Sequence, residues 1–415
     1  MRKSIVSMLA AGVALSLAAC GSTGAPATTP AAPGSAAPTA ASTPAADAGS
    51  LTIWVDETRI DTFTEIGKEF TAESGVALDV VQKPNSDLKD DFVAQAPSGQ
   101  GPDLVVGAND WTGDLVSNGL VAPIELGDAL GDIADGAKSG FTLDGQLYGV
   151  PYAVENLGLV RNNGIVKDTP ATFDEVVAQA KEAGAEFPVL IQQAETGDAY
   201  HLYPLQTSFG AQVFKDAPEG GYTAELGMGG AEGEAFATYL KKLTDEGVLN
   251  ASIGADQAKQ AFIDGKSPYM VTGPWNIEAF QEAGLDVAVL PIPSAGGQPS
   301  APFLGVQGVF LSSKSEQGLL ANQFLDYVAT KDVQEKLFEL GGRIPAIDGA
   351  ADSIDDPILK GFAEAGKDGK AMPAIPQMAA VWNHWGGAEI SIINGQASDP
   401  VAAWRTMIEN ITAEL

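Results

Sequence analysis

The chain has 415 residues, of which 45% are hydrophobic, and a formal net charge of −31 at pH 7. An acidic chain of this kind repels DNA, RNA, anionic lipid surfaces and other polyanions, so these classes of partner are disfavoured. We interpret the charge itself as a well-solvated surface. A single cysteine cannot form an internal disulfide, so the folded part must be held together by its hydrophobic cores.

The N-terminus has the three-part pattern of a lipoprotein signal peptide. Arg2 and Lys3 precede an apolar run over residues 5–19, and the run ends in small residues before Cys20. The run is shorter than the about 20 apolar residues that span a bilayer, and it is typical of a cleaved leader. The alternative is an ordinary hydrophobic helix followed by a buried cysteine. We predict a signal peptide over residues 1–20, lipid attachment at Cys20, and an extracytoplasmic protein anchored to the cell membrane.

The next segment is a predicted tether. Residues 21–50 are almost entirely Ala, Pro, Thr, Ser and Gly, which cannot bury enough apolar surface to offset the entropy cost of ordering them. Residues 51–415 have ordinary globular composition and are too many for one core, so they predict two domains.

The first folded segment is predicted to be a β-α-β unit. Residues 51–55 form an apolar strand, and Thr62 with Glu65 has the pattern of a capping box that opens a helix. Gly75 suits the end of this helix, and residues 76–81 supply the next strand. Strands joined by such a helix are usually parallel neighbours in one sheet.

Strands and helices continue to alternate along the chain, which predicts an α/β architecture without solenoid repeats. The further predicted elements are a strand over residues 103–107, a helix over 173–184, a strand over 189–192, a helix that ends at Gly247, a helix around Phe324, and a last helix around Trp404.

Residues that would support catalysis or metal binding are scarce. The two histidines, His201 and His384, do not have metal-ligand spacing, and the sequence has neither a cysteine pair nor a nucleophile motif. Gly227–Gly230 lacks the lysine of a phosphate-binding loop and is predicted to be a turn. We therefore predict no metal, no cofactor and no enzymatic activity.

Aromatic residues instead stand beside carboxylates and amides at the ends of predicted strands and in turns. A sugar ring packs its C–H faces on aromatic rings, and its hydroxyl groups need planar acceptors and donors, so this mixture favours a sugar site. The segments concerned are Asn109-Asp110-Trp111, Tyr152 with Glu155, Asp198 with Tyr200 and Tyr203, Gly273-Pro274-Trp275, and Trp382-Asn383-His384-Trp385.

Eight segments in one order resemble the extracellular solute-binding proteins of bacterial ABC importers, including the maltose/maltodextrin-binding proteins. They are Leu51-Thr52-Ile53-Trp54, Glu65-Ile66-Gly67-Lys68-Glu69-Phe70, Gly101-Pro102-Asp103, Asn109-Asp110, Val150-Pro151-Tyr152-Ala153-Val154-Glu155, Phe262 and Gly265 before Gly273-Pro274-Trp275, Pro302-Phe303-Leu304-Gly305-Val306, and Met372-Pro373-Ala374-Ile375-Pro376-Gln377-Met378 before Trp382.

This resemblance implies a two-lobed, periplasmic-binding-protein-like fold of type II. Its sheets are expected to be mixed and mostly parallel, flanked by helices, with a hinge beside a cleft. The implied N-terminal lobe comprises residues 51–154 and 305–353, and the C-terminal lobe comprises 155–304 and 354–415.

The resemblance also implies the residues that contact the sugar. Trp275 and Trp382 are expected to stack on sugar faces with Tyr200 as a third ring, whereas Trp385 either stacks or packs in the core. Trp54 and Trp404 are predicted to be core residues. The implied polar and aromatic rim consists of Asp56, Glu57, Arg59, Asp110, Trp111 and Glu155.

Two departures from the family pattern leave the identity of the sugar open. Gly107 and Trp111 replace a tryptophan and an arginine around Asp110, and Gly386 replaces an arginine after Trp385. The loop over residues 56–59 is one residue shorter than in the family, so its register is also open.

The implied function is that of a monomeric lipoprotein that binds a maltodextrin-type oligosaccharide between its lobes and presents it to membrane permease subunits. Binding needs no chemical step. The alternatives are a binding protein for another sugar or polyol, a secreted glycosidase with Asp110 and Glu155 as its acid pair, and a structural surface protein.

Overall fold

The computed structural model describes residues 49–193, 196–217, 221–350 and 355–415. The predicted signal peptide, Cys20 and nearly all of the predicted tether lie outside the described residues. Within the described ranges, no helix combines the length and the apolar character needed to cross a bilayer.

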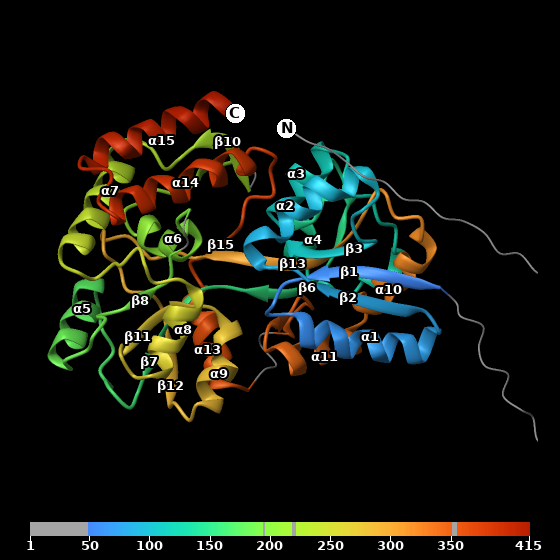
Figure 1. Cartoon of the computed structure of the whole chain (residues 1–415), viewed down its shortest axis with the longest axis horizontal. Helices are drawn as coiled ribbons and strands as arrows, with labels where there is room; N and C mark the ends of the chain where they lie inside the picture. The colour runs from blue at the N-terminus through green and yellow to red at the C-terminus, as the bar shows by residue number, and fades with distance from the viewer. Residues whose placement is uncertain (1–48, 194–195, 218–220, 351–354) are drawn as a thin grey trace, which may run out of the picture. The chain divides into compact units, whose positions relative to one another are not determined.

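A seven-stranded sheet is the largest in the described part of the chain, with the strand order β14-β6-β13-β3-β1-β2 and with β15 joined to β13 (Figure 1). Its strands are β1 (Ser50–Val55), β2 (Ala77–Gln82), β3 (Leu104–Ala108), β6 (Gly149–Glu155), β13 (Phe303–Leu311), β14 (Ile344–Pro345) and β15 (Lys370–Ala371). The helices that pack on it are α1 (Ile60–Ser74), α2 (Asn85–Gln95), α3 (Trp111–Ser117), α4 (Asp135–Gly140), α10 (Gly318–Ala329) and α11 (Lys331–Gly341). Figure 1 shows that α10 and α11, drawn in orange, lie beside the blue elements β1 and α1 although they come late in the chain.

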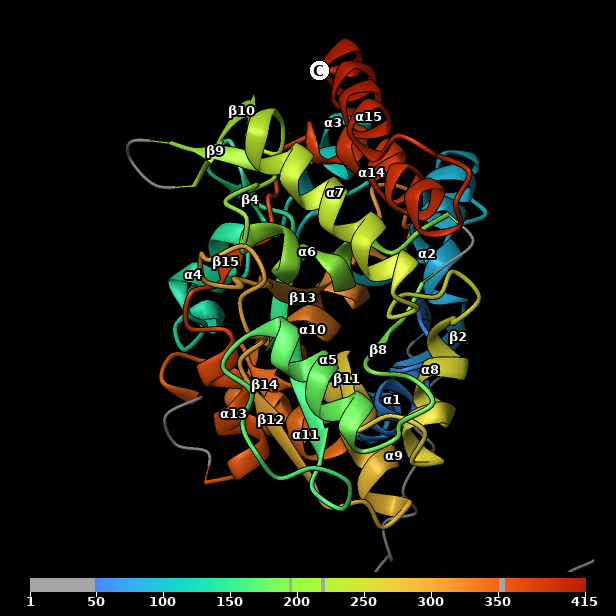
Figure 2. The same cartoon turned by 90° about the vertical axis from the view of Figure 1, so that its left-hand side faces the viewer.

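A second sheet of four strands has the order β12-β7-β11-β8 in the described residues. Its strands are β7 (Gly158–Asn162), β8 (Leu190–Ile191), β11 (Tyr269–Thr272) and β12 (Val287–Leu290). The helices of this part are α5 (Phe173–Glu182), α6 (Ala199–Thr207), α7 (Gly230–Asp245), α8 (Ala255–Ile263), α9 (Ile277–Glu282), α13 (Pro357–Ala365), α14 (Met378–Ile393) and α15 (Pro400–Glu414). Figure 2 views the side on which α5, α6 and α7 lie.

Smaller elements complete the described chain. They are the hairpins β4 (Thr142–Leu143) with β5 (Gln146–Leu147) and β9 (Phe214–Asp216) with β10 (Tyr222–Leu226), and the 3-10 turns η1 (Ala96–Ser98), η2 (Gly127–Leu130) and η3 (Pro274–Asn276).

The predicted β-α-β unit is confirmed, because β1 and β2 are parallel and α1 packs on β2. Gly75 has a φ of 76° and ends α1, as predicted. The predicted capping box is wrong, because α1 already begins at Ile60 with Arg59 as its N-cap. Thr62 is therefore inside the helix, where its hydroxyl donates to the carbonyl oxygen of Leu340 at 3.5 Å.

The sheets are mixed, as expected, but they are not mostly parallel. β1 pairs in parallel with β2 and β3, β8 with β11, and β15 with β13, but β13 is antiparallel to both β3 and β6. β7 is likewise antiparallel to β11 and β12. The reason is topological, because β13 enters the larger sheet from the later part of the chain and runs between two strands of the earlier part.

The buried apolar residues form separate clusters around the two sheets. One cluster draws its buried members from residues 51–153 and 306–346, the second from 157–303 and 372–411, and a third, smaller one from 160–362. Trp54 and Trp404 are 5% and 0% exposed, as the core prediction requires.

The chain passes between the two sheets where β6 leads into β7 and where β13 begins. Glu155 at the end of β6 pairs with Gly305 of β13 at this place. The Asn109 side chain fastens a third segment here, since its Nδ2 donates to the carbonyl of Met372 at 2.8 Å and its Oδ1 accepts from the Val306 N–H at 3.1 Å. Residues from distant parts of the sequence therefore meet beside β13.

Candidate functional site

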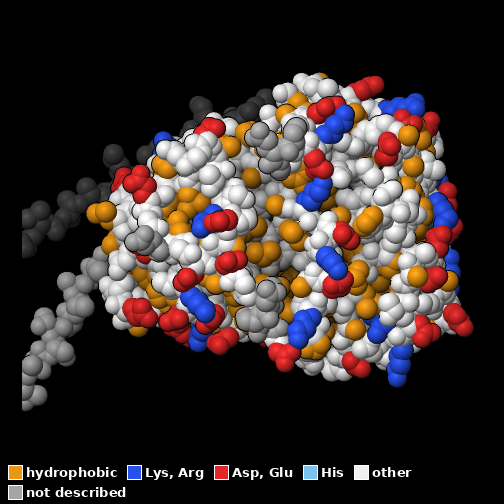
Figure 3. All heavy atoms as spheres, turned by 180° about the vertical axis from the view of Figure 1, so that it is seen from behind, with side chains coloured by type: hydrophobic (Ala, Val, Ile, Leu, Met, Phe, Trp, Pro, Cys, Tyr) orange, Lys and Arg blue, Asp and Glu red, His pale blue; other side chains and the backbone are white. Residues whose placement is uncertain are grey.

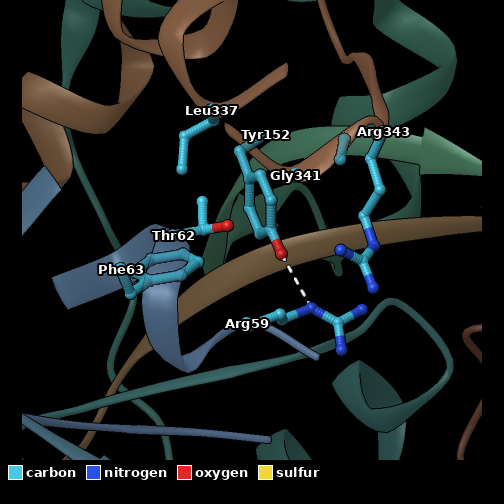
Figure 4. Close-up of a pocket in the computed structure, with 8 residues that line it drawn as sticks. Arg59, Thr62, Phe63, Tyr152, Leu337, Gly341 and Arg343 are labelled. Carbon is cyan, nitrogen blue, oxygen red and sulfur yellow. Dashed lines mark hydrogen bonds between the residues drawn. The ribbon is translucent and has the colours of Figure 1, made fainter. Parts of the chain in front are cut away.

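A charged network lies at the junction of β1, α1 and β6. The Arg59 guanidinium pairs with Asp56 and, at 3.5 Å, with Glu155. Its Nε also donates to the Tyr152 hydroxyl at 2.9 Å (Figure 4). A second arginine, Arg343, donates from Nε to the other Glu155 carboxylate oxygen at 2.8 Å.

All four charged side chains of this network are buried, with exposed fractions of 2% to 7%. Burial alone raises the pKa of Asp56, but Arg59, Thr58 and Arg343 outweigh that effect, so the pKa lies below its ordinary value. Burial lowers the pKa of Arg59, but Asp56, Tyr152 and Glu155 raise it well above its ordinary value. Asp56 and Arg59 are therefore both ionised at neutral pH.

The space inside this network is too small for a sugar. The cavity bordered by Arg59, Tyr152 and Arg343 in Figure 4 has a volume of about 10 Å³, which is about the room that one water molecule needs. Glu57, predicted to share the site, is exposed and accepts from the backbone N–H of Asn85 at 2.9 Å.

An aromatic platform lies on α14. The rings of Trp382 and Trp385 are stacked, with centroids 5.3 Å apart and planes 23° from parallel. Phe303, at the start of β13, meets both rings edge-on at 6.3 Å. Trp385 has no exposed surface and donates from Nε1 to Gln206 at 3.0 Å. Of the two roles left open for Trp385, its burial favours packing in the core, where it supports Trp382.

Asp110 and Trp382 are joined directly. The indole Nε1 of Trp382 donates to the Asp110 carboxylate at 2.8 Å, across 272 residues of sequence. Asp110 occupies the N-cap position of α3 without a side-chain capping bond, and it is 7% exposed. Burial raises its pKa, and Lys89 and the Trp382 indole only partly offset this.

Tyr200 links the platform to the charged network. The half-buried ring is stacked with Phe303 at 6.3 Å and 21°. A Cβ atom added at Gly305 would lie 3.8 Å from the Tyr200 hydroxyl and 3.7 Å from Cγ of Glu155, so both side chains flank this glycine. Burial raises the pKa of Tyr200 well above its ordinary value, and Glu155, Asp198 and Asp110 raise it further. The phenol is therefore a neutral hydrogen-bond donor.

Trp275 approaches this group through His201. The two rings meet edge-on with centroids 6.2 Å apart, and Tyr200 meets the same imidazole at 5.4 Å. His201 is held by Asp198, whose carboxylate lies 2.9 Å from Nδ1. Any side chain at Gly273 would collide with the Trp275 ring, so this glycine lets the half-buried indole lie against the backbone.

One departure from the family pattern has a packing explanation. The half-buried Trp111 ring lies over Gly107, and a Cβ atom at residue 107 would collide with the indole. The Trp111 indole takes the space that a side chain at residue 107 would fill. The tryptophan can therefore lie here only because residue 107 is a glycine.

The structure thus brings together Asp56, Arg59 and Glu155, and it joins Asp110, Tyr200 and Trp382 through the aromatic platform. Sequence reasoning missed Arg343, Phe303 and Gln307, whose Nε2 donates to Glu155 at 2.7 Å. Phe303 stood in a motif that carried the resemblance but received no role. Arg343 and Gln307 had no local sequence signal, because their partner lies more than 150 residues away.

Comparison with known proteins decides the family. The family model described as bacterial extracellular solute-binding protein matches residues 65–374. The chain belongs to this family. Extracellular solute-binding proteins bind solutes and are not enzymes, which counts against the glycosidase alternative.

Individual relatives of this solute-binding protein have names that refer to oligosaccharides. A galactooligosaccharide-binding protein of Bacillus subtilis is 27% identical, over 97% of this chain and 94% of the relative. A maltooligosaccharide ABC transporter solute-binding lipoprotein of Streptococcus pneumoniae is 27% identical, over 86% and 88%. The solved structure of a Thermus thermophilus maltotriose-binding protein with maltotriose is 30% identical, covers 88% of this chain and 99% of that chain, and superposes with a TM-score of 0.80. The two-lobed α/β fold of this solute-binding protein is therefore confirmed.

Proposed function

We propose that this solute-binding protein captures maltodextrin-type oligosaccharides. The observation that carries the proposal is the Trp382 indole, supported by Trp385 and bonded to Asp110, beside the neutral Tyr200 hydroxyl and Glu155. An indole face packs on the C–H face of a glucose unit, and the carboxylates and the phenol bind hydroxyl groups at its edge. The name of the maltotriose-bound relative supports this choice of sugar.

Capture is proposed to close two lobes over the sugar. The first lobe comprises residues 51–154 and 305–353, and the second comprises 155–304 and 354–415. Asp110 belongs to the first and Trp382 to the second, so a sugar that touches both residues favours the closed arrangement by its higher affinity for that form. The closed monomer then presents the sugar to the permease subunits of an ABC importer.

A membrane anchor completes the proposed function. Cys20 is proposed to carry a lipid once the leader that precedes it has been cleaved off, and residues 21–50 are proposed to act as a tether. The pneumococcal relative, which is named as a lipoprotein of an ABC transporter, supports this assignment. The test is labelling of growing cells with a radioactive fatty acid: the wild-type chain should take up label and stay with membranes, whereas Cys20→Ser should do neither. Label retained by Cys20→Ser would place the lipid elsewhere.

The sugar assignment is tested by thermal shift and isothermal titration calorimetry with maltose, maltotriose, a galactooligosaccharide and a polyol. A ligand at 100 times its Kd should stabilise the protein by about 2.7 kcal/mol. Trp382→Ala and Trp275→Ala should each abolish the shift with maltotriose. The matched control is Tyr327→Ala, because this half-buried ring packs on Phe70 outside the site. Full binding by both tryptophan variants would contradict the proposal.

Galactooligosaccharides are the second candidate class of ligand. The Bacillus subtilis relative that matches 97% of this chain is named for them, and Gly107 with Trp111 changes the surroundings of Asp110 relative to the family pattern. The same panel separates the two classes. A larger shift with the galactooligosaccharide than with maltotriose would favour this second candidate.

A further inference from the structure

A pocket of about 500 Å³ lies apart from the candidate site, beside β15 and the end of α6. Its walls come from residues 203–212, from 298–302 before β13, from 368–370, and from Glu232 of α7. None of the residues expected to contact the sugar lines it, although Tyr203 stood in one of the segments that favoured a sugar site. Small-molecule sites have volumes of about 300 to 1,000 Å³, so this pocket has the size of a binding site.

The pocket shares one aromatic cluster with the candidate site. Tyr203, which lines the pocket, is stacked on Phe303 with centroids 3.8 Å apart and planes 14° from parallel. Phe303 in turn contacts Tyr200 and Trp382 of the candidate site. The Tyr203 side of this cluster therefore faces a separate space.

The lining has the two kinds of surface that a sugar needs. Phe209 offers an aromatic ring that suits the C–H face of a sugar, and Pro299 adds exposed apolar surface beside it. Glu232, Asp368 and Gln298 are exposed, and within the described ranges their side chains have no hydrogen bond or ion pair with protein groups. These carboxylates and this amide are available to accept hydrogen bonds from hydroxyl groups.

The charge of the lining argues against an anionic ligand. Lys370 is the one cation among the residues that line the pocket, and its Nζ already lies 2.7 Å from both Asp216 carboxylate oxygens and 3.0 Å from Gln212 Oε1. The lining carboxylates of Glu232 and Asp368 would repel a phosphate or a sugar acid. The lining therefore suits an uncharged polyhydroxylated ligand better than an anionic one, and a cationic sugar is the alternative that the experiment below distinguishes.

We propose that this pocket is a second saccharide site, which takes an uncharged mono- or disaccharide while the candidate site holds its own ligand. The proposal predicts that each chain binds two sugar molecules. The expected count rests on the proposed function, because it takes maltose as a ligand of the candidate site as well.

The experiment is equilibrium dialysis of the full chain with radiolabelled maltose and glucose, with glucose 6-phosphate and glucosamine as charged counterparts. Wild type should bind two molecules of maltose or glucose per chain, and glucose 6-phosphate should be at least about tenfold weaker at the second site. Tighter binding of glucosamine than of glucose at that site would overturn the uncharged-ligand assignment.

Variants separate the two sites. The surface triple variant Glu232→Gln, Gln298→Ala and Asp368→Asn should retain only the candidate site, and Phe209→Ala should weaken the second site in the same direction. The matched control is Glu409→Gln, an exposed acid on α15 that does not line the pocket. Trp382→Ala should retain only the pocket. One sugar per wild-type chain, or a second sugar that persists in the triple variant, would overturn the proposal and leave the candidate site standing. Two sugars that both survive Trp382→Ala and Trp275→Ala would instead contradict the proposed function.

Discussion

Trp382 is oriented by two contacts of different kinds. The stack on Trp385 fixes the plane of its ring, and the hydrogen bond from Nε1 to Asp110 fixes the direction in which the ring points. The sequence predicted both Trp382 and Asp110 as ligand contacts, because each stands beside a turn and resembles a family position. It did not predict that they bond to each other, since no local pattern reports a contact across 272 residues.

The bond between Asp110 and Trp382 should be measurable as a coupling energy. In a double-mutant cycle with Asp110→Ala and Trp382→Phe, which removes first the acceptor and then the donor, we expect a coupling of about 1 kcal/mol in the free energy of unfolding, the usual net worth of a hydrogen bond. Urea denaturation supplies the measurement. The matched control is Asp114→Ala with Trp382→Phe, because Asp114 pairs with Lys89. A coupling for Asp110 no larger than that of the control would show that the bond contributes nothing.

Glu389 presents a different problem at the residue scale. Its side chain has no exposed surface, and neither carboxyl oxygen has a hydrogen-bond partner among the described residues. Burial raises its pKa well above the ordinary 4.5, and Asp198 adds to the rise. Asp198 contributes negative charge because His201 and Gln192 hold its own pKa low despite burial. The neutral form of Glu389 is thus favoured in the fold.

Stability should therefore depend on pH through Glu389. A carboxyl whose pKa is raised by folding contributes stability below its unfolded pKa, and this contribution is lost as the pH rises through the folded pKa. Urea denaturation of wild type and Glu389→Gln from about pH 4 to about pH 8 should show the variant gaining stability relative to wild type as pH rises. Glu409→Gln on the surface is the matched control. A difference between Glu389→Gln and wild type that stays constant across this range would contradict the assignment.

At the scale of elements, the second departure from the family pattern also has a packing cause. Gly386 of α14 lies against the loop before α6, where a Cβ atom on it would be 2.8 Å from the carbonyl oxygen of Thr196. Gly197 in that loop has a φ of +89°, and a Cβ atom on it would collide with the Gly386 carbonyl. The helix that carries Trp382 can approach the loop before Tyr200 only because both residues are glycines.

Because α14 and this loop lie so close together, adding one methyl group at Gly197 should cause a large loss of stability. Gly197→Ala should destabilise the protein by more than about 2 kcal/mol, since it adds a backbone collision to the cost of about 1 to 2 kcal/mol for a side chain at positive φ. Gly184→Ala isolates the cost of a side chain at positive φ, because Gly184 has a φ of +72° but open space around it. Thermal unfolding of both variants measures the difference. Equal losses would show that the loop moves away from α14 freely.

Sequence reasoning correctly predicted structure formed by elements that follow one another directly along the chain. The β1–α1–β2 unit follows from apolar periodicity and Gly75. The start of α1 was misplaced because Thr62 and Glu65 imitate a capping box, whereas the chain already turns into the helix at Ile60. β13 was not predicted as a strand, although its first residues stood in a segment that carried the resemblance. Its antiparallel pairing was missed because strand partners from opposite halves of the chain leave no periodic signal.

At the scale of the whole molecule, charge is the dominant feature. Figure 3 shows acidic side chains spread over one face with basic ones among them, in keeping with a formal net charge of −31. The buried network of Asp56, Arg59, Glu155 and Arg343 is internally balanced, so the excess negative charge belongs to the exterior. The composition predicted an acidic, solvated surface, but it could not show that the buried charges of this network balance one another.

Self-repulsion of this exterior should make stability depend on salt. Raising NaCl from about 0.02 M to about 0.5 M screens exposed charges, so the Tm of the full chain should rise. Scanning calorimetry measures the Tm, and calorimetric titration at the same salt concentrations measures maltotriose affinity, which should change by less than about threefold because the sugar is neutral. A Tm that is unchanged or falls would show that local ion pairs outweigh the net repulsion.

Trp385 is buried beneath Trp382 and donates a hydrogen bond to Gln206, and this arrangement affects the thermodynamics of ligand binding. The surface proposed to receive a sugar ring is therefore assembled before a ligand binds, so little side-chain freedom should be lost on binding. Discrimination among sugars then rests on how their hydroxyl patterns match a rigid template, and it should register in the enthalpy of association rather than in its entropy.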